Sequence, residues 1–293
     1  MPEQKPACAF IGLGVMGYPM AGHLAAVGCP VRVYNRTAAK TQSWTRQHGG
    51  ATADSPRQAA QGAAFVFSCV GNDDDLRAIM YGENGVLAGA ESGAMLVDHT
   101  TASAAVAQEL HQEAAARSLA FLDAPVSGGQ AGAERGQLSI MVGGDAEAFA
   151  RARPVMAAYA KTAVHMGASG AGQRTKMVNQ ICIAGLLQGL AEALNFSERA
   201  GLDTEKVLSV ISQGAAQSWQ MENRGHTMTK AEFDFGFAVD WMRKDLGIVL
   251  DEAKRNGARL PVTALVDQFY AQVQARGGGR WDTSGLIDLL ARD

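Results

Sequence analysis

Short apolar segments of strand length alternate with segments of helical spacing over the first half of the chain. The strand-like segments, each bounded by Gly, Asp or Pro, are Ala7–Ile11, Val31–Tyr34, Ala64–Val70, Met95–Asp98 and Leu119–Asp123. Helical spacing is found over Met16–Val27 and Ser103–Ala116, and Leu138–Val142 predicts a further strand before a helix over Ala146–Ala160. This alternation predicts an α/β domain with a mostly parallel, doubly wound sheet.

The second half of the chain has the pattern of an all-α domain. No proline occurs between Val155 and Leu260, and strand-like alternation disappears. Helices are expected over Gln173–Ala200, Lys206–Ser212, Trp241–Asn256 and Pro261–Ala275, with Asp203 and Ser284 as helix caps. We place the domain boundary between residues 1–167 and residues 168–293, so that one long helix joins the two domains.

Composition narrows the class of protein. A chain of 293 residues is long enough for two medium domains, and 47% hydrophobic with 19% charged residues is typical of a globular protein. A net charge of −3 gives no electrostatic reason to bind nucleic acid or an anionic membrane. The longest apolar run, Ile181 to Leu187, is interrupted by Gln188 and Glu192, so we expect no membrane-spanning helix.

Cysteine and histidine spacing indicates neither disulfides nor a metal. No two of the four cysteines form a C-x-x-C pair, and the N-terminal residues lack the apolar core of a signal peptide, so free thiols in the cytoplasm are expected. The cysteines are Cys8, Cys29, Cys69 and Cys182. The six histidines show no metal-ligand spacing, and Asp73-Asp74-Asp75 is interpreted as the start of a helix.

A glycine-rich segment directly follows the first expected strand. Gly12-Leu13-Gly14-Val15-Met16-Gly17 has the pattern G-x-G-x-x-G between a strand and a helix. There the first glycine permits a tight turn, the second the approach of a pyrophosphate, and the third close packing of the helix. Glycines also serve ordinary turns, but strand, helix and position together predict a Rossmann-type dinucleotide site.

The residues after the second strand indicate which dinucleotide binds. A carboxylate at this place would accept hydrogen bonds from the ribose of NAD, but the chain has Asn35-Arg36-Thr37. Asn35 does not repel a 2′-phosphate, while Arg36 and Thr37 offer a guanidinium and a hydroxyl. We therefore expect NADP rather than NAD; the alternative is that Arg36 is a solvated surface charge.

Three later segments carry candidate substrate chemistry. After the strand that ends at Asp123, the turn Ser127-Gly128-Gly129 offers N–H groups and a hydroxyl to a carboxylate, unless it is a plain glycine turn. Lys176, Asn179 and Gln180 share one helix face, where desolvation of the lysine would lower its pKa and favour proton transfer. Taken alone, Lys176 fits an exposed lysine, and Lys244-Asp245 fits a solvated surface pair.

In their order and spacing, these motifs resemble those of the β-hydroxyacid dehydrogenase family over the whole chain. That family includes 3-hydroxyisobutyrate dehydrogenases, tartronate semialdehyde reductases and glyoxylate/succinic semialdehyde reductases. The resemblance is carried by Gly12–Gly17, Asp123–Gly129, Gly170–Gln180 and Lys244-Asp245. The 6-phosphogluconate dehydrogenases share the fold but have histidine where Asn179 stands, and related imine reductases usually lack the lysine, so both are disfavoured.

The resemblance implies roles for individual residues. Lys176 is the acid/base, the Ser127–Gly129 turn holds the substrate carboxylate, and Asn179 and Gln180 orient the substrate. The resemblance also implies cofactor contacts at Thr101 and Lys244, and Val70, Gly71 and Asn72 are further candidates for cofactor contacts. The residues expected to shape the substrate pocket are Trp219, Phe237 and Asp245. The chain departs from many relatives in having Asn179-Gln180 for Asn-Asn, and Val70-Gly71-Asn72-Asp73 for a Leu-Pro-Asp segment.

The combined expectation is an NADP-preferring oxidoreductase that interconverts a short 3-hydroxy acid and its semialdehyde or oxo acid. A homodimer or homotetramer is expected, because the long helix carries more apolar surface than one small domain covers, at Ile181, Ile183, Leu186, Leu187, Leu190 and Leu194. The alternatives are an NAD-dependent serine or 3-hydroxy acid dehydrogenase, a decarboxylating sugar-acid dehydrogenase, and a non-catalytic dinucleotide-binding interaction protein. Retention of Lys176 argues against the last.

Overall fold

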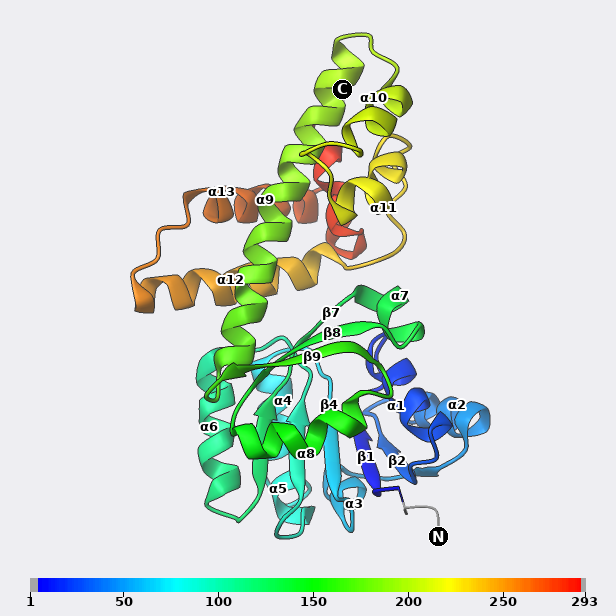
Figure 1. The fold of residues 1–293 in the computed structure, drawn as a ribbon, viewed down its shortest axis with the longest axis vertical. Coiled ribbons are helices and arrows are strands. Elements are labelled where there is room, and N and C mark those ends of the chain that lie inside the picture. Colours follow the sequence, from blue (N-terminus) through cyan, green and yellow to red (C-terminus); the bar gives the residue numbers. More distant parts are fainter. Residues whose placement is uncertain (1–4, 291–293) are drawn as a thin grey trace. The chain divides into compact units, whose positions relative to one another are not determined.

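In the computed structural model, which describes residues 5–290, the chain divides into two compact units (Figure 1). Unit 1 comprises Met1–Lys176 and unit 2 comprises Met177–Asp293. Helix α9 (Ala171–Arg199) begins in unit 1 and continues into unit 2. An α/β unit is therefore followed by a helical unit through one long helix, which confirms the expected fold class.

Unit 1 is built on a sheet that has nine strands within residues 5–290. In spatial order they are β3 (Ala51–Thr52), β2 (Val31–Tyr34), β1 (Cys8–Ile11), β4 (Phe65–Ser68), β5 (Met95–Asp98), β6 (Ala120–Asp123), β8 (Leu138–Gly143) and β7 (Val126–Ser127), with β9 (Ala160–Gly167) paired to β8. The strands from β3 to β6 are parallel, and β8 is antiparallel to β6 and β7. The carboxyl ends of β1, β4, β5 and β6 therefore share one edge, where ligands bind in such sheets.

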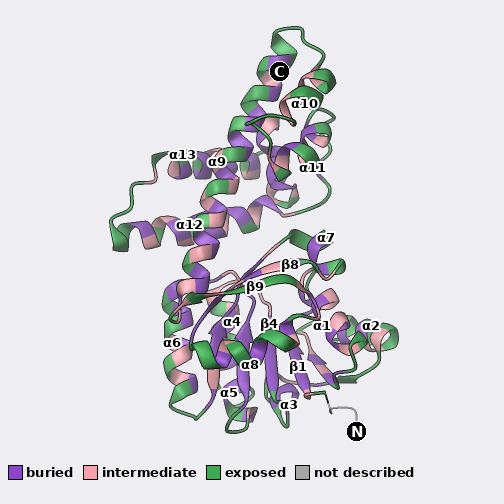
Figure 2. Cartoon of the chain, in the orientation of Figure 1, coloured by how far each residue is buried: buried purple, intermediate pink, exposed green. Residues whose placement is uncertain are grey.

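Helices cover both faces of this sheet. On one face α1 (Gly17–Ala26), α2 (Ala38–His48) and α8 (Ala146–Met156) enclose a core that contains Phe10 and Trp44. On the other face α3 (Pro56–Ala60), α4 (Asp73–Met80), α5 (Val86–Gly89) and α6 (Ala104–Ala115) enclose a core that contains Ile11. Neighbouring residues of one strand thus enter different cores, which explains the continuous apolar runs in the sequence. Figure 2 shows the central strands of the sheet as largely buried.

Unit 2 is a set of helices around its own core. After α9 it contains α10 (Thr204–Ile211), α11 (Trp219–Met228), α12 (Val239–Asn256), α13 (Pro261–Ala275) and the 3₁₀ turns η1 (Gly278–Arg280) and η2 (Thr283–Leu290). Leu187, Leu246 and Tyr270 lie in the shared core. Asp203 caps α10 as expected, because its carboxylate accepts the Lys206 N–H at 3.2 Å. Ser284 was expected to cap the last helix but lies inside η2, and its hydroxyl donates to Asp282 at 2.6 Å.

The segment after residue 145 differs from the sequence-based expectation. The helix expected over Ala146–Ala160 ends at Met156, and Ala160–Gly167 forms the strand β9. Among the described residues, one helix, α9, is long and apolar enough to cross a membrane by length and composition alone. Of its most apolar window 44% is buried inside the protein, and core helices of soluble proteins pass the same test.

Candidate functional site

The glycine-rich loop lies between β1 and α1 at the carboxyl edge of the sheet. Gly12 has φ +95°, and a Cβ there would collide with the carbonyl oxygen of Cys69. A Cβ at Gly17 would collide with the carbonyl oxygen of Gly12, so α1 packs directly on the loop. A Cβ at Gly14 would meet nothing within 4 Å among the described residues. The backbone at Gly14 is thus open to a ligand, and the loop fits the pyrophosphate of a dinucleotide.

The start of α1 suits an anion. Its N-cap residue, Met16, makes no side-chain hydrogen bond to the helix, and the first turn of this fully described helix holds no acidic residue. Val15 beside it is exposed, and Leu13 is buried. The first N–H groups of a helix lack backbone partners and carry partial positive charge, so they favour a negatively charged ligand.

Asn35 joins this loop to the turn after β2. Its Oδ1 accepts the Leu13 N–H at 2.9 Å, and its Nδ2 donates to the Thr37 carbonyl at 3.2 Å. Both ends of the amide are therefore used within the protein. Arg36 is different, because its side chain is 90% exposed and only its Nη1 approaches a carboxylate, that of Asp75, at 3.7 Å. Lys40, in the first turn of α2, is exposed too; its place four residues after Arg36 could have identified it from the sequence as a second cation near this turn.

Polar groups connect the ends of β4 and β5. The Thr100 hydroxyl accepts the Val70 N–H at 3.0 Å and donates to the buried carboxylate of Asp98 at 2.7 Å. Ser68 donates to the same carboxylate at 2.7 Å. Burial raises the pKa of Asp98 to about 7, against the lowering effect of these hydrogen bonds. The loops that carry Val70, Gly71 and Thr101 are thereby held beside each other.

The candidate cofactor contact Asn72 has a structural task. Its side chain caps α4 by accepting the Asp75 N–H at 2.8 Å. The Asp73-Asp74-Asp75 cluster occupies the first turn of that helix, as expected from the sequence, and Asp73 accepts the Ser103 N–H at 2.8 Å. The cluster therefore stabilises a helix start and fixes the β5–α6 loop.

His99, which follows Asp98, is buried and neutral. Its Nδ1 donates to the Ala124 carbonyl at 2.7 Å, because a carbonyl can only accept, and its Nε2 accepts the Tyr159 hydroxyl at 2.8 Å. Burial lowers the pKa of His99 to about 4. The ring also stacks on Phe67 at 5.9 Å between centroids. His99 is a core residue that holds β5 beside the segment after β6.

The Ser127-Gly128-Gly129 turn follows β7 and leads into the short helix α7 (Gly129–Glu134). Gly128 has φ +133° and Gly129 has φ +60°, both in the region that favours glycine. A Cβ at Gly129 would meet nothing within 4 Å among the described residues, and both glycines are exposed. The turn thus presents backbone to solvent beside a half-buried serine hydroxyl, as a carboxylate-binding turn requires.

Lys176 lies on the second turn of α9, and the start of this helix is fixed by two buried side chains. The Asp123 carboxylate, at the end of β6, accepts the N–H groups of Gly170 at 2.7 Å and Gln173 at 2.9 Å. The Gln173 amide accepts the Ala102 N–H at 3.1 Å and donates to the Thr100 carbonyl at 2.7 Å. Lys176, itself buried, is therefore placed relative to the ends of β5 and β6.

A chain of polar contacts joins α9 to α12 within unit 2. Asn179 donates to Gln180 at 2.7 Å, and Gln180 donates to the buried Asp245 carboxylate at 2.7 Å. The other oxygen of Asp245 lies 2.9 Å from the Lys244 ammonium, an ion pair outside hydrogen-bond geometry. The candidate residues Asn179, Gln180, Lys244 and Asp245 are therefore brought together. The Lys244-Asp245 pair is not a solvated surface pair, because the Asp245 side chain is 1% exposed.

The remaining candidates, Trp219 and Phe237, lie around Arg224. Trp219 begins α11, and its ring centroid lies 5.1 Å from the Arg224 Cζ. The Phe237 N–H donates to Asp282 at 3.0 Å, and Arg224 Nε donates to the same carboxylate at 3.1 Å. Sequence reasoning missed Arg224, Asp282, Asp98 and Gln173, because hydrogen bonds between distant segments leave no periodic signal.

Comparisons with known proteins find similar dehydrogenase domains in both units of the chain. Residues 7–167 match the family described as the NAD-binding domain of 6-phosphogluconate dehydrogenase, and residues 170–290 match that described as NAD-binding of NADP-dependent 3-hydroxyisobutyrate dehydrogenase. A protein of Shewanella frigidimarina named as an uncharacterised oxidoreductase is 63% identical over 97% of this chain and 98% of its own length. The 2-(hydroxymethyl)glutarate dehydrogenase of Eubacterium barkeri is 33% identical over 98% of this chain and 95% of its own.

A solved structure is similar over the whole chain. That of Mycobacterium tuberculosis 3-hydroxyisobutyrate dehydrogenase with L-serine has a TM-score of 0.89 and 32% identity. The similarity covers 98% of this chain and 100% of that one.

Proposed function

The chain belongs to the 3-hydroxyisobutyrate dehydrogenase-like family of NAD(P)-dependent oxidoreductases, and we propose that it interconverts a short 3-hydroxy acid and its semialdehyde or oxo acid, with NADP as the preferred cofactor. The observation that carries this proposal is the placement of Lys176. The buried Asp123 and Gln173 fix its helix against the edge that also holds the glycine-rich loop. Residues for proton transfer and for dinucleotide binding thus belong to one unit.

Lys176 is the proposed acid/base. When the 3-hydroxy acid is oxidised, the amine of Lys176 takes the hydroxyl proton, and in the reverse direction the ammonium returns it to the oxygen. The bound nicotinamide supplies the other half of the chemistry by accepting or donating a hydride at the carbon. Lys176 is buried, so its amine is shielded from bulk water at the place where the proton is exchanged.

The Ser127–Gly129 turn is the proposed anchor of the substrate carboxylate. Its exposed glycine backbone and serine hydroxyl can donate hydrogen bonds to both carboxylate oxygens. Fixing the carboxylate places the carbon two bonds away at a constant distance from the anchor. This favours acids whose hydroxyl is on the 3-carbon.

Of the two adjacent amides, we assign the substrate contact to Asn179. Gln180 is buried, and both ends of its amide are used, by Asn179 and by Asp245. Gln180 then acts by positioning Asn179. Asp245 in turn holds Lys244 beside it, which is the proposed second lysine of the cofactor site. Trp219 and Phe237 line the proposed pocket.

The preference for NADP rests on the turn after β2. Arg36 and Lys40 are exposed cations four residues apart, and Thr37, the residue before α2, lies between them. A 2′-phosphate carries negative charge and strong acceptor oxygens that such groups would bind. Asn35 keeps this turn beside the glycine loop without adding a carboxylate.

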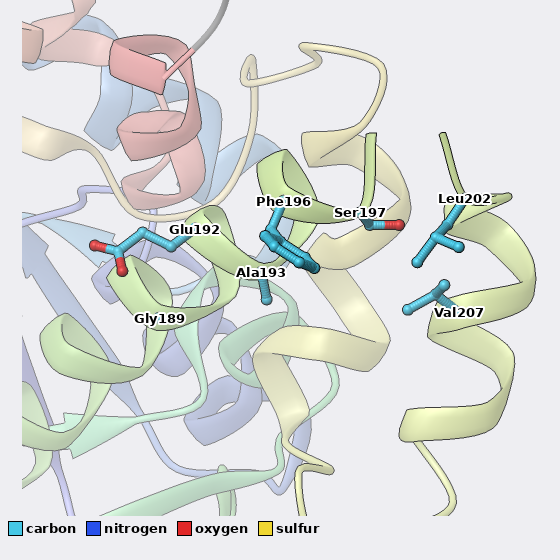
Figure 3. A pocket seen from close by; sticks show the side chains of 7 residues that line it. All are labelled: Gly189, Glu192, Ala193, Phe196, Ser197, Leu202 and Val207. Atoms are coloured by element: carbon cyan, nitrogen blue, oxygen red, sulfur yellow. The ribbon is translucent and has the colours of Figure 1, made fainter. Parts of the chain in front are cut away.

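We also propose a homodimer through α9 and α10. Leu187, Leu190 and Leu194, which the sequence analysis counted as uncovered apolar surface, are buried in the core of unit 2. The exposed stripe of α9 is formed instead by uncharged residues at helical spacing and ends at Phe196, 71% exposed; its positions are 178, 182, 186, 189, 193 and 196. This stripe adjoins a pocket between α9 and α10, lined by Phe196, Leu202 and Val207 (Figure 3). A continuous apolar face of this kind favours a second copy of the chain as its cover.

The function is tested by turnover. The purified protein is assayed with 3-hydroxyisobutyrate, serine, tartronate semialdehyde, glyoxylate and succinic semialdehyde, each with both cofactors, by the absorbance of the reduced nicotinamide. Turnover of at least one of these, with higher kcat/KM for NADPH than for NADH in reduction, is expected. A folded protein that binds NADPH but turns over none of them would contradict the proposal and favour the non-catalytic alternative.

A further inference from the structure

His23 lies in the last turn of α1, the helix that follows the glycine-rich loop. Its Nε2 donates to two backbone carbonyl oxygens of α7, that of Ala133 at 3.0 Å and that of Glu134 at 3.1 Å. Nε2 is the donor because a carbonyl oxygen can only accept. The helices α1 and α7 also pack on each other. One side chain thus connects the helix behind the glycine-rich loop to the helix behind the Ser127–Gly129 turn.

The surroundings of His23 keep its ring in this place. The chain turns at Gly136, just after α7, with φ +64°, and a Cβ there would lie 3.3 Å from His23 Cε1. A larger residue at this position would therefore press on the ring. Leu24, the next residue of α1, and Ala133 of α7 are fully buried in the same core. The half-buried His23 ring thus closes the edge of a packed contact between the two helices.

Helix α7 depends on such contacts for its position. It has six residues, and a helix of this length is not stable by itself. Its N-cap residue, Gly128, makes no side-chain hydrogen bond, and Gly128 and Gly129 have the backbone freedom of glycine. Leu138 of β8 lies beneath the start of α7, 3.1 Å from where a Cβ of Gly128 would be. His23 supports the other end of the helix.

We propose that His23 is a positioning residue, which holds α7 against α1 and thereby fixes the Ser127–Gly129 turn relative to the glycine-rich loop. This inference rests on the proposed function, in which the turn binds the substrate carboxylate and the loop binds the dinucleotide. Both segments and both helices belong to unit 1. Hydride transfer requires the substrate carbon at a set distance from the nicotinamide, so the separation of the two binding segments matters for the reaction. The alternative is a histidine that only stabilises unit 1.

The experiment removes the donor of His23 and keeps a ring. His23→Phe has no N–H group, whereas the amide of His23→Gln can place an N–H near the position of Nε2. His111→Phe is the matched control, because His111 is a half-buried histidine of α6 whose Nδ1 lies 3.5 Å from the Phe121 carbonyl oxygen. It lies on the helix layer of the other face of the sheet.

Four quantities are measured for the wild type and each variant. Calorimetry gives the Kd of NADP and, with NADP bound, the Kd of isobutyrate, which is 3-hydroxyisobutyrate without its hydroxyl group. Isobutyrate therefore tests the carboxylate anchor without turnover. Thermal melting gives the stability, and steady-state kinetics give kcat/KM for the hydroxy acid that the wild type oxidises best.

His23→Phe should raise the Kd of isobutyrate by about 2- to 13-fold, the equivalent of the 0.5–1.5 kcal/mol that a hydrogen bond typically contributes. It should lower kcat/KM by about tenfold or more, because small misplacements of reacting groups are costly. The Kd of NADP should stay nearly constant, since the glycine-rich loop is unchanged. His23→Gln should restore most of the isobutyrate affinity, and His111→Phe should leave it as in the wild type.

An unchanged isobutyrate Kd in folded His23→Phe would overturn the inference even if the melting temperature falls, because a merely stabilising histidine gives that result. Where the variants fail to fold, nuclear magnetic resonance of isotope-labelled histidine in the wild type decides. A proton on Nε2 of His23 supports the inference, and a bare Nε2 would overturn it.

Failure of the proposed function gives a different result. A wild type that binds isobutyrate but oxidises no hydroxy acid would contradict that function, while the isobutyrate Kd of the His23 variants would still decide the role of His23. A wild type that binds NADP but no isobutyrate would refute the carboxylate anchor and the inference with it.

Discussion

The carboxylate of Asp123 accepts the backbone N–H of Gln173 at 2.9 Å, which ties the end of β6 to the first turn of α9. The Gln173 side chain continues this connection to the loop after β5, through the Thr100 carbonyl and the Ala102 N–H. Lys176 follows Gln173 by three residues on the same helix. The place of the proposed acid/base is thus determined by two side chains that sequence motifs alone do not single out as a pair.

Replacing Lys176 tests the proposed chemistry. Lys176→Ala should lower kcat by at least about a hundredfold while NADPH affinity changes little, because acid–base catalysis typically contributes about 10²–10⁴-fold. Lys176→Arg should fail as well, since a guanidinium keeps its proton near neutrality. The measurements are steady-state kcat, NADPH titration and thermal melting. Lys161→Ala, at an exposed lysine of β9, is the control. Near-normal kcat in folded Lys176→Ala would end the mechanism.

Replacing Gln173 tests its role as a positioning residue. Gln173→Met should leave the Thr100 carbonyl and the Ala102 N–H without their partner, which costs about 1–3 kcal/mol of the free energy of unfolding. It should also lower kcat about tenfold or more by displacing Lys176, with little change in KM for NADPH. Gln188→Met changes another buried glutamine of α9 and should affect melting alone. Equal kcat in both variants would refute positioning by Gln173.

The cofactor preference should depend on Arg36. Arg36→Ala should raise KM for NADPH more than about tenfold and leave KM for NADH nearly unchanged, because a charge-assisted hydrogen bond to the 2′-phosphate is lost. Arg46→Ala, an exposed arginine later on α2, is the matched control. If both cofactors respond equally to Arg36→Ala, the assignment of NADP is wrong.

Asp98 and His99 should give opposite pH dependences of stability. The pKa of Asp98 is raised from 3.8 to about 7 by burial, so the folded state retains a proton that the unfolded state loses, and stability falls as pH rises through this window. The pKa of His99 is lowered from 6.5 to about 4, so between these values the unfolded state takes up a proton and stability rises with pH. Over pH 4 to 6.5 the two effects oppose each other.

Replacing Asp98 should therefore leave only the effect of His99 on the pH dependence of stability. The melting temperature of Asp98→Asn should increase relative to that of the wild type as pH rises from about 4 to about 6.5, because only the His99 effect remains. The check is thermal melting of both proteins in buffers of equal ionic strength. Parallel curves for the two proteins would show that Asp98 is not protonated in the folded state at acidic pH.

The apolar stripe of α9 should control assembly. Phe196→Asp should shift the protein from dimer to monomer at micromolar concentration, because it places a charge in the proposed interface. Val27→Asp alters a 46% exposed valine of unit 1 and should leave the molar mass unchanged. Light scattering measures both. A wild-type protein that is monomeric at micromolar concentration would refute the dimer.

The sequence predicts β1, β4 and β5 well, because these strands are buried along their whole length and bounded by breakers. Met95–Asp98, for example, is found where it was expected. Strand β9 was missed because most of its residues are at least partly exposed, and Lys161 and Thr162 interrupt its apolar pattern. A strand that pairs on one side and faces solvent needs little hydrophobic signal.

The residues of the candidate site likewise fall into those that sequence motifs predict and those that only the folded structure shows. The expected roles of Gly12, Gly14 and Gly17 follow from local backbone geometry, and the structure leaves no room for a Cβ at Gly12 or Gly17 and open space at Gly14. The pairing of Arg224 with Asp282 spans 58 residues, and only the folded chain brings them together. Sequence motifs therefore predict sites formed by residues close together in the chain. Contacts between distant residues, such as the one between Arg224 and Asp282, can be found only in the folded structure.

An aspartate in place of Asn35 would still accept the Leu13 N–H, because it has an oxygen at the same position as Asn35 Oδ1. It would lose the donor to the Thr37 carbonyl and would add a negative charge beside Arg36. Asparagine and aspartate codons differ by a single base. If the proposed cofactor site is right, one nucleotide substitution should favour NAD while the glycine loop keeps its anchor. Lineages of such enzymes could then exchange one metabolic redox pool for the other without passing through a misfolded ancestor.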